Sequence, residues 1–435
     1  MESSGVLKRE LGVFSATMMG LGSILGTGVF VSIGIAAGVA GPSVILAIAA
    51  AALVATFNGL NSAQLAANHP VSGGTYEYGY RYLNSWLGFT AGWTFLLAKT
   101  ASAATAALGF AGYLLNLFRV DASRLLVPLG LAAVIAMTVI VLSGLKRSNS
   151  TNIAIVSITI FALILFVVAG LPSVVNAGVE NFTPFMSDDR PVASLLQATA
   201  FMFVAYTGYG RIATMGEEVR EPRRIIPRAI IAAMIVTMIL YLSVAFVGVG
   251  AVGTEVLAGA AGTEAAPLEV AARQFGYPLV PLLVAAGAIT AMLGVLLNLI
   301  LGLSRMLLAM GRRSDMPPAT ARINEVTSTP YVAVVVIGGA IAALVLIGNV
   351  RTTWSFSAFT VLIYYAITNL ASLRLNEQER LYPRWLAVAG LIACLFLAFW
   401  VEIQIWLVGL GLIAFGLVWH VVAQRLARRP PREIT

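Results

Sequence analysis

Two clusters of glycines are the residues of this chain whose spacing points most directly to chemistry. They consist of Gly20, Gly22, Gly26 and Gly28 in MGLGSILGTGVF and of Gly208, Gly210 and Gly216 in YTGYGRIATMG. Each glycine costs a helix interior about 1 kcal/mol relative to alanine, so both segments are predicted to be interrupted helices. An interruption exposes backbone N–H and C=O groups that lipid cannot satisfy. Because helix N-termini favour a carboxylate and freed carbonyls favour an ammonium group, the two clusters predict a site for a zwitterion.

Close helix packing is the alternative interpretation of these glycines, since small residues also lie where membrane helices meet. One cluster alone would favour packing. Glycine-interrupted segments in the first and the sixth apolar segment of the chain indicate corresponding positions in two halves of a transporter, with the binding site between them.

Lys99 is a charged residue within an apolar segment, FLLAKTASAATA. A charge at the centre of a membrane helix costs about 2.5–3.5 kcal/mol on insertion scales, so a partner is expected. Two interpretations stay open: Lys99 contacts the substrate or takes part in ion coupling, or it is a structural residue bonded to freed carbonyls. Arg211 follows the second cluster and is predicted to be structural, paired with Glu217, Glu218 or a carbonyl.

Enzymatic and metal chemistry find no support in the sequence. Cys394 is the single cysteine, and His69 and His420 lie at the ends of distant apolar segments. The chain has no phosphate-binding loop of the form G-x-x-x-x-G-K-[ST]. No cofactor, no resident metal and no enzyme activity are therefore expected, although a sodium ion remains a candidate for coupling. The amino-terminal residues run directly into an apolar segment, so no signal peptide is expected.

The composition requires a membrane to surround the chain. Of the 435 residues, 59% are hydrophobic and 11% are charged, against about 25% charged in soluble domains. A secreted enzyme, a nucleic-acid binder and a soluble regulator are thereby excluded. Apolar windows between charges and Gly/Pro breaks predict an all-α integral membrane protein with twelve spans, at 12–38, 43–67, 86–116, 125–143, 151–171, 193–215, 229–251, 278–308, 330–348, 353–373, 384–401 and 403–424.

The distribution of basic residues predicts the orientation. Of the 27 lysines and arginines, 19 fall on the side of the amino terminus and five on the other side, and Lys99, Arg211 and Arg305 lie within or at the edge of spans. This positive-inside bias places both termini in the cytoplasm of a plasma (inner) membrane protein. No Asp or Glu falls at the middle of a predicted span, which disfavours the simplest proton relay through a buried carboxylate.

The chain resembles the amino acid–polyamine–organocation (APC) superfamily of secondary transporters, in its prokaryotic amino acid permease and cationic amino acid transporter-like branches. The motifs that carry the resemblance are LKRELGVFSATMMGLGSILGTGVF, HPVSGGTYEYGYRYL, GFTAGWTFLLA, GLKRSNSTN and FVAYTGYGRIATMGEEVREPRRIIPRAI, with a weaker match in GLSRMLLAMGRRSDMPP. The resemblance implies one transmembrane domain over 1–435 with a five-plus-five inverted repeat (the LeuT-like, APC fold). The repeats would span about 11–172 and 191–375, the first and sixth helices would be broken, and two trailing helices would cover 383–425.

The same resemblance assigns the substrate site. Backbone N–H groups of Ser23, Gly26, Thr27 and Gly28 would hold the carboxylate. Carbonyls of Ile24, Phe203 and Ala205 would hold the α-ammonium group. The substrate side chain would be read by Tyr206 and Thr207.

Three positions of the chain depart from the pattern of this family. Lys99 stands where relatives often have Tyr, Gly210 where they often have an acid, and Thr159 where many sodium-independent relatives have Lys. Lys99 is therefore a candidate for proton coupling, and Thr159 with Ser304 for a sodium site. The gate candidates are Arg9, Glu217 and Glu218 on the inner side and Phe356 and Phe359 on the outer side.

The function predicted from these features is amino acid transport by alternating access, either proton-coupled or by exchange. Neutral L-amino acids are favoured because no carboxylate is available for a cationic side chain, and small residues after Lys99 leave room. An acidic substrate stays open as an alternative if Lys99 and Arg211 both face the cavity. The alternatives are a sodium-coupled symporter, a transporter of cationic or acidic amino acids or amines, and a non-transporting amino acid sensor. A channel or a membrane enzyme would need charged rings or an ionisable cluster that the sequence lacks.

Overall fold

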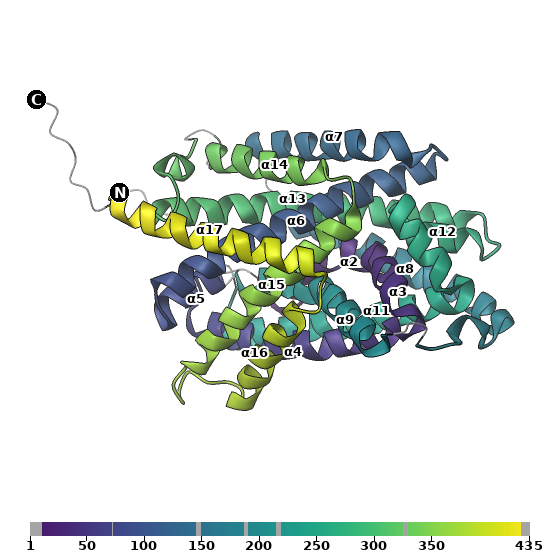
Figure 1. The fold of residues 1–435 in the computed structure, drawn as a ribbon, viewed down its shortest axis with the longest axis horizontal. Helices are drawn as coiled ribbons and strands as arrows, with labels where there is room; N and C mark the ends of the chain where they lie inside the picture. Colours follow the sequence, from purple (N-terminus) through teal and green to yellow (C-terminus); the bar gives the residue numbers. More distant parts are fainter. Residues whose placement is uncertain are drawn as a thin grey trace, which may run out of the picture.

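The computed structural model describes residues 11–71, 73–144, 149–186, 190–214, 219–324, 327 and 329–427. Within these residues the chain is helical, and its only β-pairing is two isolated bridges, Leu11 with Val219 and Asn324 with Thr329. Most of the long helices run nearly along the longest axis of the molecule (Figure 1). The all-α prediction is confirmed for the described part of the chain.

Nine helical stretches in the described residues are long and apolar enough to cross a membrane. They are Thr27–Asn68, Ser85–Leu117, Arg124–Leu142, Asn149–Ala177, Pro191–Ala213, Pro222–Thr263, Leu279–Arg312, Val350–Leu373 and Ile403–Arg425. Three shorter apolar helices accompany them: Val13–Ile24, Tyr331–Val345 and Arg384–Ala398. A helix therefore occupies each predicted span, whereas the number of twelve crossings and the inverted repeat stay predictions.

The helices used below are α1 (Val13–Ile24), α2 (Thr27–Phe30), α3 (Ser32–Ala40), α4 (Val44–Asn68), α5 (Thr75–Tyr82), α6 (Ser85–Leu117), α8 (Asn149–Ala177), α9 (Pro191–Tyr206), α10 (Gly210–Ala213), α11 (Pro222–Thr263), α12 (Pro267–Arg273), α13 (Leu279–Arg312), α15 (Val350–Leu373), α16 (Arg384–Ala398) and α17 (Ile403–Ala427). Among the others, α7 (Ala122–Leu142) and α14 (Tyr331–Val345) lie together along one edge of the molecule (Figure 1).

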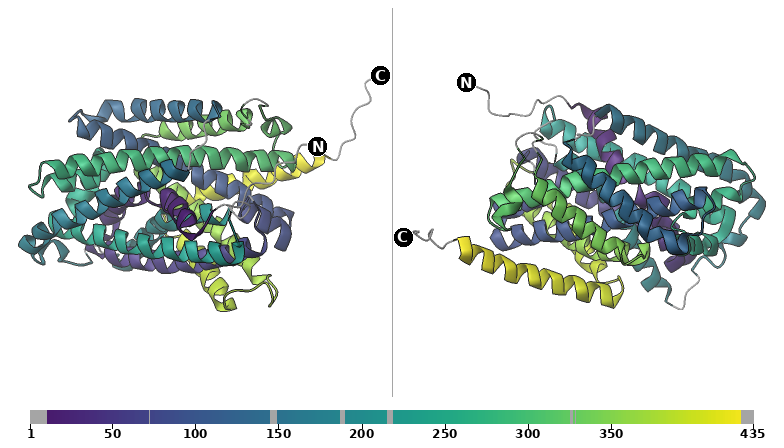
Figure 2. Two further views of the ribbon diagram at one scale, coloured as in Figure 1. Left: turned by 180° about the vertical axis from the view of Figure 1, so that it is seen from behind. Right: turned by 90° about the horizontal axis from the view of Figure 1, so that it is seen from above.

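Large apolar side chains point out of the bundle. Phe161 and Val168 on α8 are 59% and 60% exposed, and Val418 on α17 is 64% exposed. Figure 2 shows α17 at the periphery in the view from above. Side chains of this kind are stable outside the core only if lipid covers them, which agrees with the membrane assignment.

Both glycine clusters disturb their helices, but to different degrees. In the first, α1 ends at Ile24, Leu25 has extended backbone, Gly26 is also non-helical, and α2 begins at Thr27. The second disturbance is milder than an open interruption. There α9 tightens into a 3₁₀ turn, η3 (Thr207–Tyr209), before α10 begins at Gly210. A 3₁₀ segment within a helix shifts the hydrogen-bond register and leaves carbonyls available to other partners.

Candidate functional site

The two disturbed segments lie directly against each other. A Cβ atom added to Gly208 would overlap the backbone of Ser23 and Ile24, and one added to Gly28 would lie 2.7 Å from the Cβ of Ala205. Only residues without side chains allow backbones to approach so closely. Packing and site formation are therefore not alternatives here, because the close packing brings the backbone polar groups of both segments together.

Tyr241 of α11 connects the carbonyl groups of the two segments. Its hydroxyl lies 2.9 Å from the carbonyl oxygen of Ile24 and 3.2 Å from that of Ala205. A tyrosine hydroxyl donates one hydrogen bond, so it satisfies one of these oxygens at a time. Ile24 and Ala205 are two of the three carbonyls predicted for the ammonium group, and Tyr241 keeps them near each other.

Donor groups lie on the other side of the first interruption. The N–H groups of Val29 and Phe30 are already bonded to the carbonyl of Gly26, both at 3.1 Å, so the donors at the start of α2 are the N–H groups of Thr27 and Gly28. The N–H groups at the start of a helix have no acceptor within that helix. The buried hydroxyl of Thr27 also has no hydrogen-bond partner among the described residues. The start of α2 therefore offers donors that suit a carboxylate.

A small cavity joins these donors and acceptors. Of the predicted substrate residues it is lined by Ser23, Ile24, Thr27, Gly28, Lys99, Ala205 and Thr207, together with Trp354, whose indole N–H donates to Phe201 O at 3.0 Å. The other predicted residues lie behind this lining. Gly26 packs against Val295, since an added Cβ would lie 2.7 Å from its side chain. Phe203 packs edge-on against Tyr365, with ring centres 5.6 Å apart, and the Tyr206 hydroxyl donates to Ile48 O at 3.4 Å.

Lys99 reaches the second segment from α6. Its ammonium group donates to Thr207 Oγ1 at 2.8 Å, and that hydroxyl donates to Val204 O at 2.7 Å. Lys99 and Thr207 line the small cavity and also a larger neighbouring one. Lys99 is therefore bonded to a side chain of the site and also faces the space that a ligand would occupy.

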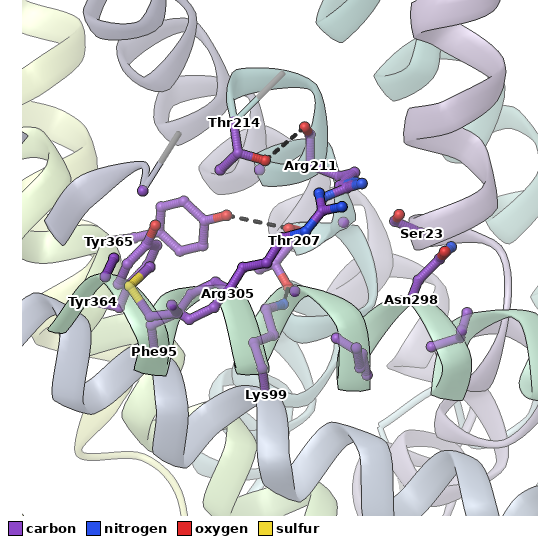
Figure 3. A pocket seen from close by; sticks show the side chains of 18 residues that line it. Ser23, Phe95, Lys99, Thr207, Arg211, Thr214, Asn298, Arg305, Tyr364 and Tyr365 are labelled. Carbon is purple, nitrogen blue, oxygen red and sulfur yellow. Dashed lines mark hydrogen bonds between the residues drawn. The ribbon is translucent and has the colours of Figure 1, made fainter. Parts of the chain in front are cut away.

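The larger cavity has a volume of about 160 Å³ and is lined along one side by residues of α13 from Val295 to Ala309. Three cationic side chains, Lys99, Arg211 and Arg305, line it, and Figure 3 draws them around the same space. Tyr365 donates to the carbonyl of Thr207 at 3.2 Å and forms part of the wall. Arg211, which the sequence predicts to be structural, thus also lines this cavity, as does Arg305, which the sequence analysis did not single out as a candidate.

The two sodium candidates are not among the residues that line either cavity. Thr159 on α8 donates to Ile155 O at 2.8 Å, and Ser304 on α13 donates to Leu301 O at 3.1 Å. Each hydroxyl thus bonds to a carbonyl of its own helix. Groups of three or more His, Cys, Asp or Glu that could hold a metal do not occur among the described residues.

The structure describes only the two outer gate candidates. Arg9, Glu217 and Glu218 lie outside the described residues. Phe359 is fully buried and packs against Phe399 of the α16 end, with ring centres 6.1 Å apart, and neither it nor Phe356 lines a cavity.

Two buried acids away from the site escaped the sequence analysis. Asp315, just beyond α13, accepts hydrogen bonds from the hydroxyls of Tyr76 and Tyr80, both at 2.7 Å. Glu269 on α12 is 1% exposed and pairs with Arg273 at 3.0 Å. Its burial raises the pKa of the Glu269 carboxyl to about 7, and the Arg273 partner offsets only part of that rise.

A bundle of apolar helices with two disturbed helices in contact, and cavities beside them, is the architecture of a membrane transporter. Comparison of the sequence with protein families agrees: the amino acid permease family matches residues 15–425. The chain belongs to this family, within the APC superfamily, and its relatives are transporters and not enzymes.

Three relatives illustrate the range of the similarity. An uncharacterized transporter of Mycobacterium tuberculosis is 38% identical over 97% of this chain and 93% of its own length. The branched-chain amino acid permease BcaP of Bacillus subtilis is 28% identical over 94% of this chain and 93% of its own length. The chloroplastic cationic amino acid transporter 7 of Arabidopsis thaliana is 25% identical over 95% of this chain and 71% of its own length.

Proposed function

We propose that this chain is a secondary active transporter that moves an amino acid across the plasma membrane by alternating access, with both termini in the cytoplasm. The contact between the two disturbed helices carries the proposal. Donors at the start of α2 and the carbonyls of Ile24 and Ala205 border one small cavity. An amino acid supplies the matching carboxylate and ammonium group on adjacent atoms.

The position of the larger cavity supports an inward-facing arrangement. It extends past Gly73 before α5, Thr214 after α10 and Ala309 near the end of α13. These helix ends lie on the side that the basic residues assign to the cytoplasm. On the opposite side α12 packs closely: the Tyr113 hydroxyl donates to Phe30 O at 2.7 Å and accepts from Leu268 N at 3.2 Å.

A thermal-shift screen of the purified protein tests the proposal. The twenty amino acids and their simple amines are added one at a time, because a ligand stabilises the folded protein by RT ln(1 + [L]/Kd). The proposal expects a shift with at least one amino acid, followed by uptake of the same compound into proteoliposomes. A screen in which no amino acid stabilises the protein or enters proteoliposomes would contradict it.

For coupling, we propose proton exchange at Lys99, because lysine can release its proton when buried and arginine does not. Uptake driven by a pH gradient without sodium, and loss of that dependence in Lys99→Arg, is the expected result. The alternative is a sodium site that uses Thr159 and Ser304. Strict sodium dependence, or unchanged pH-driven uptake in Lys99→Arg, would contradict the role of Lys99 and favour this alternative.

The sequence favours neutral L-amino acids as substrates, and the similarity to a branched-chain amino acid permease agrees with that class. The charges around the larger cavity bear on the same question, and they favour a different class.

A further inference from the structure

The larger cavity is lined by three basic side chains. Lys99, Arg211 and Arg305 are among its lining residues, and no Asp or Glu is among the residues described there. The sequence made an acidic substrate conditional on Lys99 and Arg211 both facing the cavity. Both of them line it, and Arg305 adds a third positive charge.

Two of these cations have no acidic partner within the described chain. The ion pairs found there use Arg224, Arg273, Arg313, Arg351 and His420. Neither Lys99 nor Arg305 takes part in one, and the partner of Lys99 is the neutral hydroxyl of Thr207. Lys99 is partly buried and Arg305 is exposed, and both line the cavity. A cation at this position is stabilised when an anion approaches it and destabilised when another cation does.

The larger cavity runs along α13, with Val295 at one end and Arg305 towards the other. Val295, Asn298, Gly302 and Arg305 recur at helical spacing and line one wall. Val295 lies against Gly26 at the first interruption, whereas Arg305 comes almost three turns later. Figure 3 shows the long side chain of Arg305 extending from α13 into the cavity towards Thr207. An amino acid bound at the interruptions would therefore direct its side chain towards Lys99 and Arg305.

We propose that the substrate is an amino acid with a carboxylate side chain, of the aspartate or glutamate class, and that Lys99 and Arg305 bind this carboxylate. The proposal rests on the proposed function, since it assumes an amino acid held at the interruptions. A neutral substrate supplies no counter-charge to Lys99 and Arg305, and a cationic one adds to their charge. A planar guanidinium such as Arg305 suits a carboxylate because it donates two parallel hydrogen bonds.

Equilibrium binding to the purified full-length protein tests the inference. The probes are L-glutamate, L-glutamine, which has nearly the same shape without the charge, and 2-oxoglutarate, which lacks the ammonium group. Glutamate is expected to bind at least tenfold more tightly than glutamine, since a hydrogen bond to a charged group is worth about that factor. It should also bind more tightly than 2-oxoglutarate, because the carbonyls of the site need an ammonium group.

Substitutions on α13 test whether Arg305 binds the side-chain carboxylate. Arg305→Gln is expected to weaken glutamate binding roughly tenfold to a hundredfold and to change glutamine binding less than about twofold. Arg305→Lys keeps the charge and should retain most of the preference. Arg312→Gln is the matched control, because Arg312 is exposed on the same helix and does not line the cavity; it should change neither affinity.

The outcomes separate this inference from the proposed function. Glutamine binding as tightly as glutamate, or equal weakening of both by Arg305→Gln, overturns the acidic class while the amino acid transporter stands. Binding of 2-oxoglutarate as tightly as glutamate overturns the amino acid as the source of the carboxylate. If no amino acid binds or stabilises the protein, the proposed function itself fails.

Discussion

Gly28→Ala is a direct perturbation of the contact between the two disturbed helices. The added methyl group would lie 2.7 Å from the Cβ of Ala205, 2.9 Å from its Cα and 3.0 Å from the Tyr241 hydroxyl. Carbon atoms in contact normally lie 3.5–4.0 Å apart, so the segments must separate by about 1 Å. Because the neighbours are a backbone atom and a methyl group of α9, no flexible side chain can move aside instead.

This separation strains the candidate site. Overpacking by one methyl group typically costs about 1–3 kcal/mol, and the strained geometry is the one in which Ala205 O and Ile24 O meet. If the substrate needs that geometry, its affinity falls by the same free energy, roughly five- to 150-fold. Titration of the purified variant with the amino acid that stabilises the wild type measures this loss.

Gly302→Ala is the matched control for the loss of a glycine. Gly302 also lines the larger cavity, but an added Cβ meets nothing within 4 Å. Alanine favours a helix, so this variant should bind within about twofold of the wild type and unfold at the same or a higher temperature. If Gly28→Ala lowered the thermal midpoint but bound substrate as tightly as Gly302→Ala, the glycine would serve packing alone and the reasoning would be refuted.

Three further predictions concern stability. Tyr241→Phe removes the donor shared by Ile24 O and Ala205 O and should lower the free energy of unfolding by about 1 kcal/mol. The expected measurement is a lower thermal midpoint in detergent. An unchanged midpoint would argue against the hydrogen bonds of the Tyr241 hydroxyl to these carbonyls. Burial raises the pKa of Glu269 to about 7, above its value in the unfolded chain, so the free energy of unfolding should be highest below pH 4.5 and fall by up to about 3 kcal/mol as the pH rises to about 7. Glu269→Gln should flatten this pH profile. Equal slopes for the wild type and the variant would contradict the assignment. Asp315→Ala leaves the hydroxyls of Tyr76 and Tyr80 without their acceptor and should destabilise the protein by about 2 kcal/mol or more. Asp315→Asn keeps an acceptor oxygen and should destabilise it less. Equal thermal midpoints for the two variants would refute the role of Asp315 as the acceptor.

The sequence predicted those parts of the fold that depend on local chain properties. Apolar length and charge placement located the helices, and glycine content located the disturbance in α1 and the weaker one after α9. Two predicted spans, 330–348 and 384–401, correspond to α14 and α16, which are single helices shorter than 18 residues. One of them, α16, starts directly after Pro383, where a helix commonly begins. Hydropathy alone does not report such boundaries.

The parts that escaped prediction depend on contacts between distant residues. Tyr241 lies in an ordinary apolar helix, and nothing in its sequence neighbourhood indicates that its hydroxyl meets both disturbed segments. Arg305 was recognised only as a charge near the end of a span. A count of the residues on each face of that helix could have found it, since Val295, Asn298 and Arg305 follow helical spacing.

The central claim is that a zwitterion binds where the two disturbed helices meet, and one binding series tests it most directly. The series compares L-glutamate and L-leucine with their decarboxylated amines, 4-aminobutyrate and isoamylamine, and with their deaminated acids, glutarate and 4-methylpentanoate. Each lost charge-assisted hydrogen bond is worth roughly 1.5–3 kcal/mol, so the amino acid that binds should lose at least tenfold in affinity when either group is removed. Equal affinity of an amine or a deaminated acid and its parent amino acid would contradict the account.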